Sequence, residues 1–162
     1  MSYRCATCGE FHDDLPDLSV DKPDYYWDVP EAERSQRIEI TPDTCVVDNE
    51  YFFIRGVIEV PILESGRAFG LGVWVSQKRE NFQTYLTNYD SDEIGPFFGW
   101  LSNTIAYYRE ETLLLKTMAH FRGRGLRPKI ELERTDHQLA VDQANGITMK
   151  KAWEIAHYYL GG

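Results

Sequence analysis

The segment that most constrains the fold is the run from Tyr51 to Ile62, in which β-branched and aromatic residues follow one another with few interruptions. Side chains of these types fit the pleated, half-buried surface of a sheet better than they fit a helix. A second run of the same kind spans Ala68 to Val75, and its glycines indicate a bulge or the close approach of another backbone. Both runs are therefore predicted to be strands.

Shorter alternating patterns predict more strands on either side of these two runs. Isoleucine alternates with glutamate at 38–40, and a turn-forming triplet at 48–50 comes directly before the long run. The glycines at 123 and 125 favour a turn that leads into another clean alternation. The additional strands are predicted at 37–40, 45–47, 97–101, 113–121 and 129–132.

Helical periodicity is clearest where Phe82, Tyr85, Leu86 and Tyr89 recur at the spacing of one helix face. These four side chains are expected to pack against the sheet. The chain is richest in helical signals near its C-terminal end. Helices are predicted at 30–34, 78–89, 135–146 and 148–160.

The pattern as a whole predicts an α+β fold, with a mostly antiparallel sheet, helices packed on it and an N-terminal Cys/His knuckle. A chain of 162 residues has the usual size of one domain, so residues 1–162 are assigned to a single domain. Residues 1–45 form a subelement of it, made of the metal-type knuckle and a loop region. Within that subelement, residues 13–30 lack sustained periodicity and are predicted to be an ordered loop.

The charge balance bears on possible partners. The chain has 17 Lys and Arg against 26 Asp and Glu, which gives a formal net charge of -9. That charge repels a phosphate backbone, so nucleic-acid binding is not expected. It suits a cationic protein partner, although an acidic surface also serves solubility alone.

No apolar stretch reaches the length of about 18 residues that a membrane-spanning helix needs, and the first residues lack a signal-peptide pattern. We therefore expect no membrane association and a cytoplasmic location. Three cysteines in a reducing compartment argue against a disulfide framework. Metal binding or free thiols remain as the two interpretations.

The N-terminal knuckle is the most specific metal-type motif in the chain. Cys5, Cys8 and His12 supply two thiols and one imidazole within eight residues. Sulfur and nitrogen ligands at this spacing suit Zn²⁺ in a closed, structural site, and Cys45 is the remaining thiol that can complete a tetrahedron. Ordinary reduced cysteines in a turn and thiol redox chemistry are the alternative interpretations.

Motifs spread along the whole chain form a recognisable set. They are Cys5-x-x-Cys8-Gly9-x-x-His12, Asp43-x-Cys45-Val46-x-Asp48, Phe52-Phe53-Ile54-Arg55-Gly56, Gly72-Val73-Trp74-Val75-Ser76, Gly99-x-Leu101-x-Asn103-Thr104, Arg127-Pro128-x-Ile130-x-Leu132-Glu133-x-Thr135-Asp136-His137-x-Leu139-Ala140, Gln143 and Gly146-Ile147. With them the chain resembles a bacterial family known as domain-of-unknown-function family 2199. Gln138 departs from the family pattern, which has proline there. The resemblance implies the domain boundaries and no activity.

A polar group near the C-terminal end is the candidate site for a ligand or for acid–base chemistry. It centres on His137, with Glu133 and Arg127 as the other candidate residues. A structural interpretation competes with it, because Thr135 and Gln138 have the spacing of a helix capping box. The basic residues at 122, 124, 127 and 129 can likewise seat a phosphate or carboxylate, or form a solvated hairpin end.

The common enzyme signatures are absent from the sequence, so an enzyme is the less favoured class. Trp74 and Trp100 fall in predicted strands and are expected to pack in the core. The leading hypothesis is a non-enzymatic cytoplasmic binding or interaction protein with a structural Zn²⁺. The alternatives are a small-ligand binder or enzyme that uses His137, Glu133 and Arg127, and an immunity-type protein that masks a basic toxin. The sequence does not determine the oligomeric state.

Overall fold

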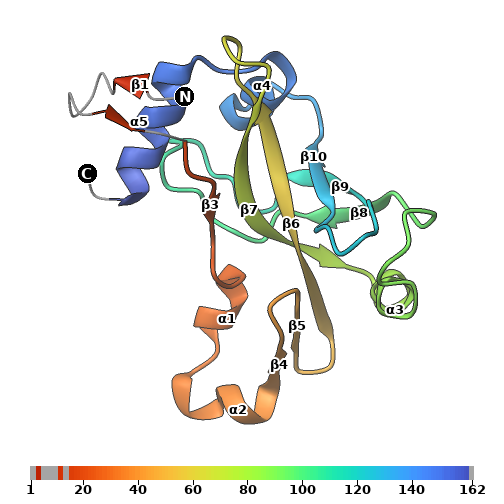
Figure 1. Cartoon of the computed structure of the whole chain (residues 1–162). Helices are drawn as coiled ribbons and strands as arrows, with labels where there is room; N and C mark the ends of the chain where they lie inside the picture. Colours follow the sequence, from red (N-terminus) through yellow and green to blue (C-terminus); the bar gives the residue numbers. More distant parts are fainter. Residues whose placement is uncertain (1–2, 5–10, 13–14, 161–162) are drawn as a thin grey trace.

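The structure is a computed structural model that describes residues 3–4, 11–12 and 15–160 (Figure 1). The strands are β1 Tyr3–Arg4, β2 Phe11–His12, β3 Leu18–Ser19, β4 Ile38–Ile40, β5 Thr44–Val47, β6 Tyr51–Pro61, β7 Ala68–Gln77, β8 Phe97–Trp100, β9 Lys116–His120 and β10 Lys129–Leu132. The helices are α1 Asp24–Asp28, a 3-10 turn Glu31–Glu33, α2 Arg34–Arg37, α3 Arg79–Thr87, α4 Gln138–Asn145 and α5 Met149–Leu160.

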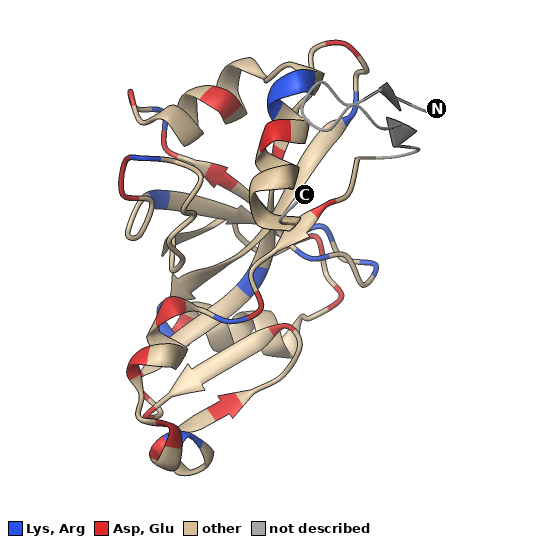
Figure 2. Cartoon of the chain, turned by 90° about the vertical axis from the view of Figure 1, so that its left-hand side faces the viewer, with Lys and Arg blue, Asp and Glu red and all other residues tan. Residues whose placement is uncertain are grey.

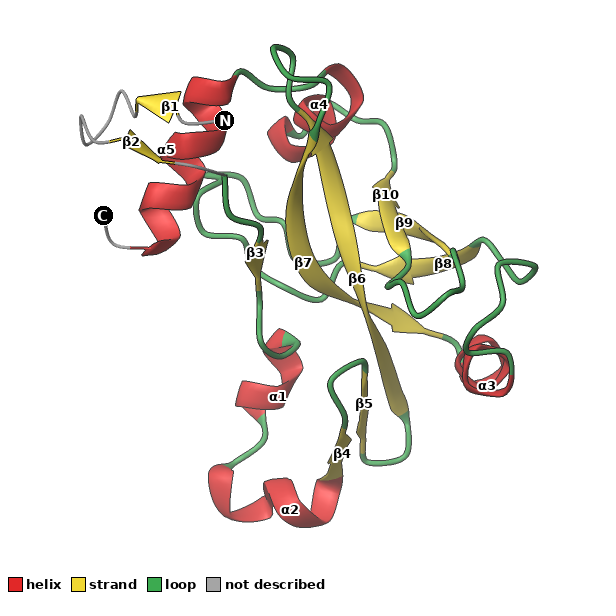
Figure 3. Ribbon diagram, in the orientation of Figure 1, coloured by secondary structure: helices red, strands yellow, loops and turns green. Residues whose placement is uncertain are grey.

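The two long strands predicted from the sequence, β6 and β7, form an antiparallel pair at the centre of the molecule (Figure 3). The main sheet has eight strands, six of which follow the order β3-β7-β6-β10-β9-β8, while β5 pairs with β6 and β4 pairs with β5. Two pairings are parallel, β3 with β7 and β10 with β6. The α+β class is therefore confirmed, with a mixed sheet in which most pairings are antiparallel.

The sheet curls until its last strand meets its second. Trp100 N–H donates to Ser76 Oγ at 3.1 Å, and Ser102 N–H donates to the Trp74 carbonyl oxygen at 2.8 Å. An isolated antiparallel bridge joins Val75 to Leu101. These contacts close β7, β6, β10, β9 and β8 into a ring around apolar side chains.

The larger core lies inside this curled sheet and beneath the helices. Strand β6 sends Ile54 and Ile58 inward, and both are fully buried. Helix α3 contributes Phe82 and Tyr85, as its spacing predicts, whereas Leu86 and Tyr89 are half exposed and the prediction for these two is wrong.

A smaller core lies at the other end of the molecule, where α1, β4 and β5 gather (Figure 1). Trp74 is fully buried there and donates from Nε1 to the Val20 carbonyl oxygen at 3.1 Å. The predicted packing of Trp74 is thus confirmed, while Trp100 is 40% exposed and the prediction for it is wrong. The predicted loop over 13–30 contains β3 and α1, which are too short to produce a detectable periodicity.

The charge of the protein is concentrated at that same end. Residues 21–50, called the acidic lobe below, hold nine Asp and Glu against three Lys and Arg. Residues 51–162 hold thirteen of each kind and are neutral as a group. Figure 2 shows acidic positions gathered around the helices and strands of the lobe. The lobe therefore carries -6 of the net charge of -9, residues 51–162 add none, and the remaining -3 belongs to residues 1–20.

Candidate functional site

The structure assigns His137 a structural role at the start of α4. Its Nδ1 accepts a hydrogen bond from Leu139 N–H at 3.0 Å, and its Nε2 lies 3.1 Å from the Glu111 carbonyl oxygen. The imidazole is only 7% exposed. Nδ1 is an acceptor, so Nε2 carries the proton and donates to Glu111. Both ring nitrogens are therefore used inside the fold.

The prediction that a side chain caps this helix is confirmed, but the residue predicted for the cap, Thr135, is wrong. The N-cap is His137, whose ring replaces the expected hydroxyl. Thr135 Oγ1, two residues before the N-cap, instead accepts from His137 N–H at 3.2 Å. A histidine can cap in this way because Nδ1 lies at the same reach from the backbone as an asparagine oxygen.

The other members of the predicted polar group point elsewhere. Arg127 Nε donates to Asp43 Oδ1 at 3.0 Å, which ties the segment before β10 to the acidic lobe. Glu133 is exposed, and its backbone N–H bonds the carbonyl oxygen of Lys116 at 2.9 Å. The structure thus does not bring His137, Glu133 and Arg127 together into one site.

A buried carboxylate near α4 escaped the sequence analysis. Asp142 is 4% exposed and accepts from the Tyr108 hydroxyl at 2.7 Å and from Gln138 Nε2 at 2.8 Å. Lys151 Nζ lies 2.7 Å from the same carboxylate. Burial, and then the hydrogen bond to Asp142, raise the pKa of Tyr108. The cluster joins α4 to α5 through the Asp142 carboxylate. Because the described polar groups of the cluster bond one another, it leaves none of them free for chemistry.

The predicted metal ligands fall in different parts of the chain. Cys5 and Cys8 lie outside the described residues, and only the strand β2 is described for His12. Cys45 is fully buried in the smaller core, where burial raises the pKa of its thiol to about 11. Its strand β5 and the strand β2 lie at opposite ends of the molecule (Figures 1 and 3). This placement gives no support to Cys45 as a ligand of the same ion.

Among the residues that the structure describes, no group of three or more His, Cys, Asp and Glu side chains is arranged to hold a metal ion. The zinc prediction for Cys5, Cys8 and His12 stays a prediction.

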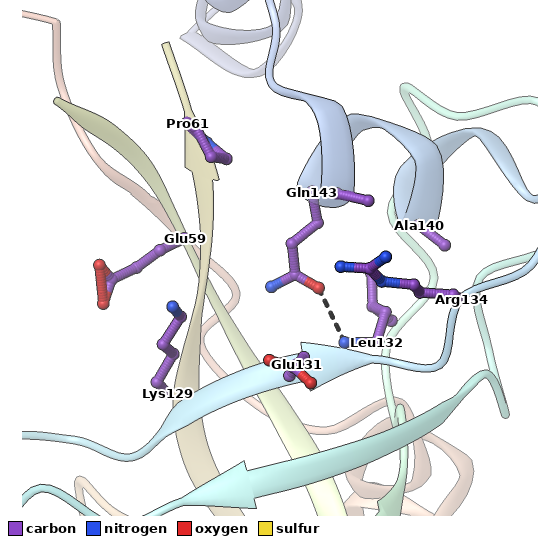
Figure 4. Close-up of a pocket in the computed structure, with 9 residues that line it drawn as sticks. Glu59, Pro61, Lys129, Glu131, Leu132, Arg134, Ala140 and Gln143 are labelled. Carbon is purple, nitrogen blue, oxygen red and sulfur yellow. Dashed lines mark hydrogen bonds between the residues drawn. The ribbon is translucent and has the colours of Figure 1, made fainter. Parts of the chain in front are cut away.

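A groove of about 150 Å³ opens between β6, β10 and α4 (Figure 4). It is close to the predicted polar group in sequence but is lined by different side chains. Sequence reasoning had singled out Lys129 and Gln143 and had missed Glu59 and Arg134. The alternation of side chains along β6 could have identified Glu59, because it places that residue on the same face of the sheet as Arg55. The lining residues are Glu59, Pro61, Lys129, Glu131, Leu132, Arg134, Ala140, Gln143 and Ala144.

A second, shallower hollow of about 380 Å³ lies on the acidic lobe. Three large apolar side chains of this end are exposed: Trp27 at 56%, Ile40 at 38% and Tyr51 at 41%. The Arg34 guanidinium lies over the Trp27 ring, 5.2 Å from its centre, and holds the indole at the surface. The hollow is lined by Tyr26, Glu31, Arg34, Ser35, Ile38 and Ile40.

The fold and these surfaces define a small α+β protein with a curled mixed sheet, an acidic lobe and a polar groove. Residues 4–147 match the family described as an uncharacterised protein conserved in bacteria, DUF2199, so the chain belongs to that family. No curated protein and no solved structure matches the chain. In the described part of the chain, no helix has the length and apolar character needed to cross a bilayer.

Proposed function

We propose that this protein is a non-enzymatic binding protein whose acidic lobe docks a cationic protein. The charge separation carries the proposal, since the lobe has three times as many acidic as basic residues while residues 51–162 are balanced. A surface of one sign attracts an oppositely charged partner before contact and orients it during approach. The opposite end of the molecule would then face away from the partner.

The apolar side chains of the lobe supply the contacts that charge alone does not. Aromatic anchors near the centre of an interface typically contribute most of the binding energy, and charged residues surround them. Trp27 is the largest exposed side chain of the lobe, and it stacks on Arg34, which lines the hollow. We therefore expect Trp27 to be the anchor and the surrounding carboxylates to set the preference for a basic partner.

The alternative of catalysis or ligand binding through His137, Glu133 and Arg127 has less support. Both ring nitrogens of His137 are engaged within the fold, and Arg127 is paired with Asp43. An immunity-type protein that masks a basic toxin is a particular case of the proposed surface. The charge and exposure of the lobe would suit that case equally.

The proposal keeps a structural Zn²⁺ at the N-terminal knuckle, held by Cys5, Cys8 and His12. Two thiols and an imidazole within eight residues support it, because they are ligand types that Zn²⁺ prefers. When bound, the ion would crosslink the turn and contribute to folding. The three side chains would be deprotonated at the ligating atoms, so binding would weaken in acid.

Affinity capture from bacterial cytosol tests the docking proposal. The immobilised wild type is compared with the lobe variants Trp27→Ala and Glu31→Lys, and with Glu93→Lys, which makes the same charge change outside the lobe. We expect a basic protein to be retained by the wild type and by Glu93→Lys, to be lost with both lobe variants, and to elute as salt shortens the screening length below about 8 Å. Equal retention by all four proteins would sink the proposal.

A further inference from the structure

The groove between β6, β10 and α4 exists because the pairing of β10 with β6 ends after a single residue pair. The two strands share one register pair, Lys129 with Val57, and Val57 N–H donates to the Pro128 carbonyl oxygen at 2.9 Å. In a continuous parallel ladder, the next residue of β6 to bond β10 would be Glu59, two positions further on. The ladder does not continue to that residue.

A side chain takes the place of the missing strand contacts. Gln143 Nε2 donates to the Ile130 carbonyl oxygen at 2.8 Å, and Gln143 Oε1 accepts from Leu132 N–H at 2.8 Å (Figure 4). These are the two backbone groups that Glu59 would bond if β10 stayed beside β6. The amide of Gln143 therefore satisfies β10 and holds α4 in the gap between the strands.

The consequence for β6 is a backbone site that faces the groove. Along a strand, successive N–H groups point to opposite edges. Those of Arg55 and Val57 point to the edge shared with β5 and β10, where they bond Asp43 and Pro128. The N–H and C=O of Glu59 point to the same edge, where Gln143 has replaced the strand that would have bonded them.

Two cations line this site without a partner of their own. Among the described residues, neither Lys129 nor Arg134 makes a side-chain hydrogen bond or an ion pair, and Figure 4 shows them on either side of the Gln143 amide. Glu59 is paired with Arg122 through a contact of 2.6 Å, so Glu131 is the carboxylate of the lining that has no partner among the described residues. Among the described residues, the groove thus presents one excess positive charge beside the edge of β6 at Glu59, to which the pairing with β10 does not extend.

We propose that this groove binds a small organic carboxylate. Arg134 can bond both carboxylate oxygens with its planar fork, and Lys129 and the Glu59 N–H add donors from the other side. The apolar lining of Pro61 and Leu132 suits a short aliphatic tail. Glu131 repels a doubly charged phosphate more than a singly charged carboxylate.

The size of the groove limits the ligand. A cavity of about 150 Å³ holds a molecule of roughly six non-hydrogen atoms, the size of benzene. Butyrate has that size and combines a carboxylate with an aliphatic tail, which makes it a suitable probe. Its affinity is expected to be on the order of 1 mM, as for a small ligand with one strong polar contact.

A titration of ¹⁵N-labelled protein with butyrate, followed by backbone amide shifts, tests the proposal. We expect saturable shifts at Glu59 and Leu132, and a dissociation constant that rises about tenfold in Arg134→Gln and in Lys129→Gln. The control Arg124→Gln removes a charge at the hairpin end outside the groove and should bind as the wild type does. Melting temperatures of all variants establish that each is folded.

Three results overturn the proposal. The first is the absence of saturable shifts at Glu59 in the folded wild type, and the second is binding that Arg134→Gln leaves unchanged. The third is tighter binding of inorganic phosphate than of butyrate in a parallel titration, which would assign a different ligand class to the groove. None of these results bears on the acidic lobe, which lies at the other end of the molecule (Figure 1).

Discussion

Gly99 of β8 lies directly against the backbone carbonyl oxygen of Ser76 in β7, and a side chain of even one carbon at position 99 would collide with it. Gln77 strengthens the same junction by donating from Nε2 to the carbonyl oxygens of Ser76 and Phe98 at 2.8 and 3.1 Å. This close approach lets the sheet curl until its strands enclose the main core. The glycine is therefore a condition for closure.

The first prediction concerns that junction. Gly99→Ala should lower the free energy of unfolding by about 1–3 kcal/mol, because neither backbone can move without disturbing the packed core. The neighbouring variant Phe98→Ala removes a side chain that is 38% exposed and should cost less. Urea denaturation measures both changes. A Gly99→Ala protein as stable as the wild type would contradict the described closure.

The second prediction concerns the cap of α4. His137→Ala should destabilise the protein by about 1–2 kcal/mol, since it leaves Leu139 N–H without its acceptor. His137→Asn should recover part of this loss, because asparagine is a favoured N-cap while the bond to Glu111 stays absent. Thermal and urea unfolding give the comparison. Equal losses in the two variants would argue against a capping role.

The third prediction concerns Cys45 at high pH. Its folded-state pKa of about 11 exceeds the ordinary thiol value of about 8.5, so the folded state holds its proton where the unfolded state has lost it. The stability due to this group is complete below about pH 8.5 and is lost as the pH rises toward 11.

Cys45→Ala removes that dependence. The difference in unfolding free energy between wild type and Cys45→Ala should therefore shrink or reverse between pH 8.5 and 11, as measured by urea denaturation at several pH values. Other groups titrate equally in both proteins and cancel in the difference. A difference that is independent of pH would show that the thiol is not protected. Alkylation of Cys45 in the native protein at neutral pH would also show that the fold does not protect the thiol.

The fourth prediction concerns the knuckle. Protein purified without added zinc should contain close to one metal equivalent, and Cys8→Ser should lose it. Cys45→Ala should keep the metal, because Cys45 is enclosed by the smaller core far from β2. Elemental analysis of the three proteins measures the metal content. Loss of metal in Cys45→Ala would restore Cys45 to the ligand set, and metal-free, well-folded wild type would remove the site altogether.

Much of the fold was predictable because its signals are local. The β-branched run of β6, the glycine-containing run of β7 and the helix-spaced aromatic residues of α3 identify their elements within about ten residues of chain. The candidate site was less predictable. Residues of one polar cluster in sequence, such as Arg127 and His137, turned to different partners, Asp43 and Glu111, in the folded chain.

The amino-acid sequence by itself determined the α+β class, the central strands and the unequal distribution of charge, since each depends on residue type and short-range spacing. Only the tertiary structure decided that β10 runs parallel to β6, that Gln143 replaces Glu59 as the partner of β10, and that a groove opens between them. Strand pairing joins residues more than 70 positions apart through backbone groups that all residues share. Such contacts leave no local pattern in the side chains, so they become visible only when the whole chain is packed.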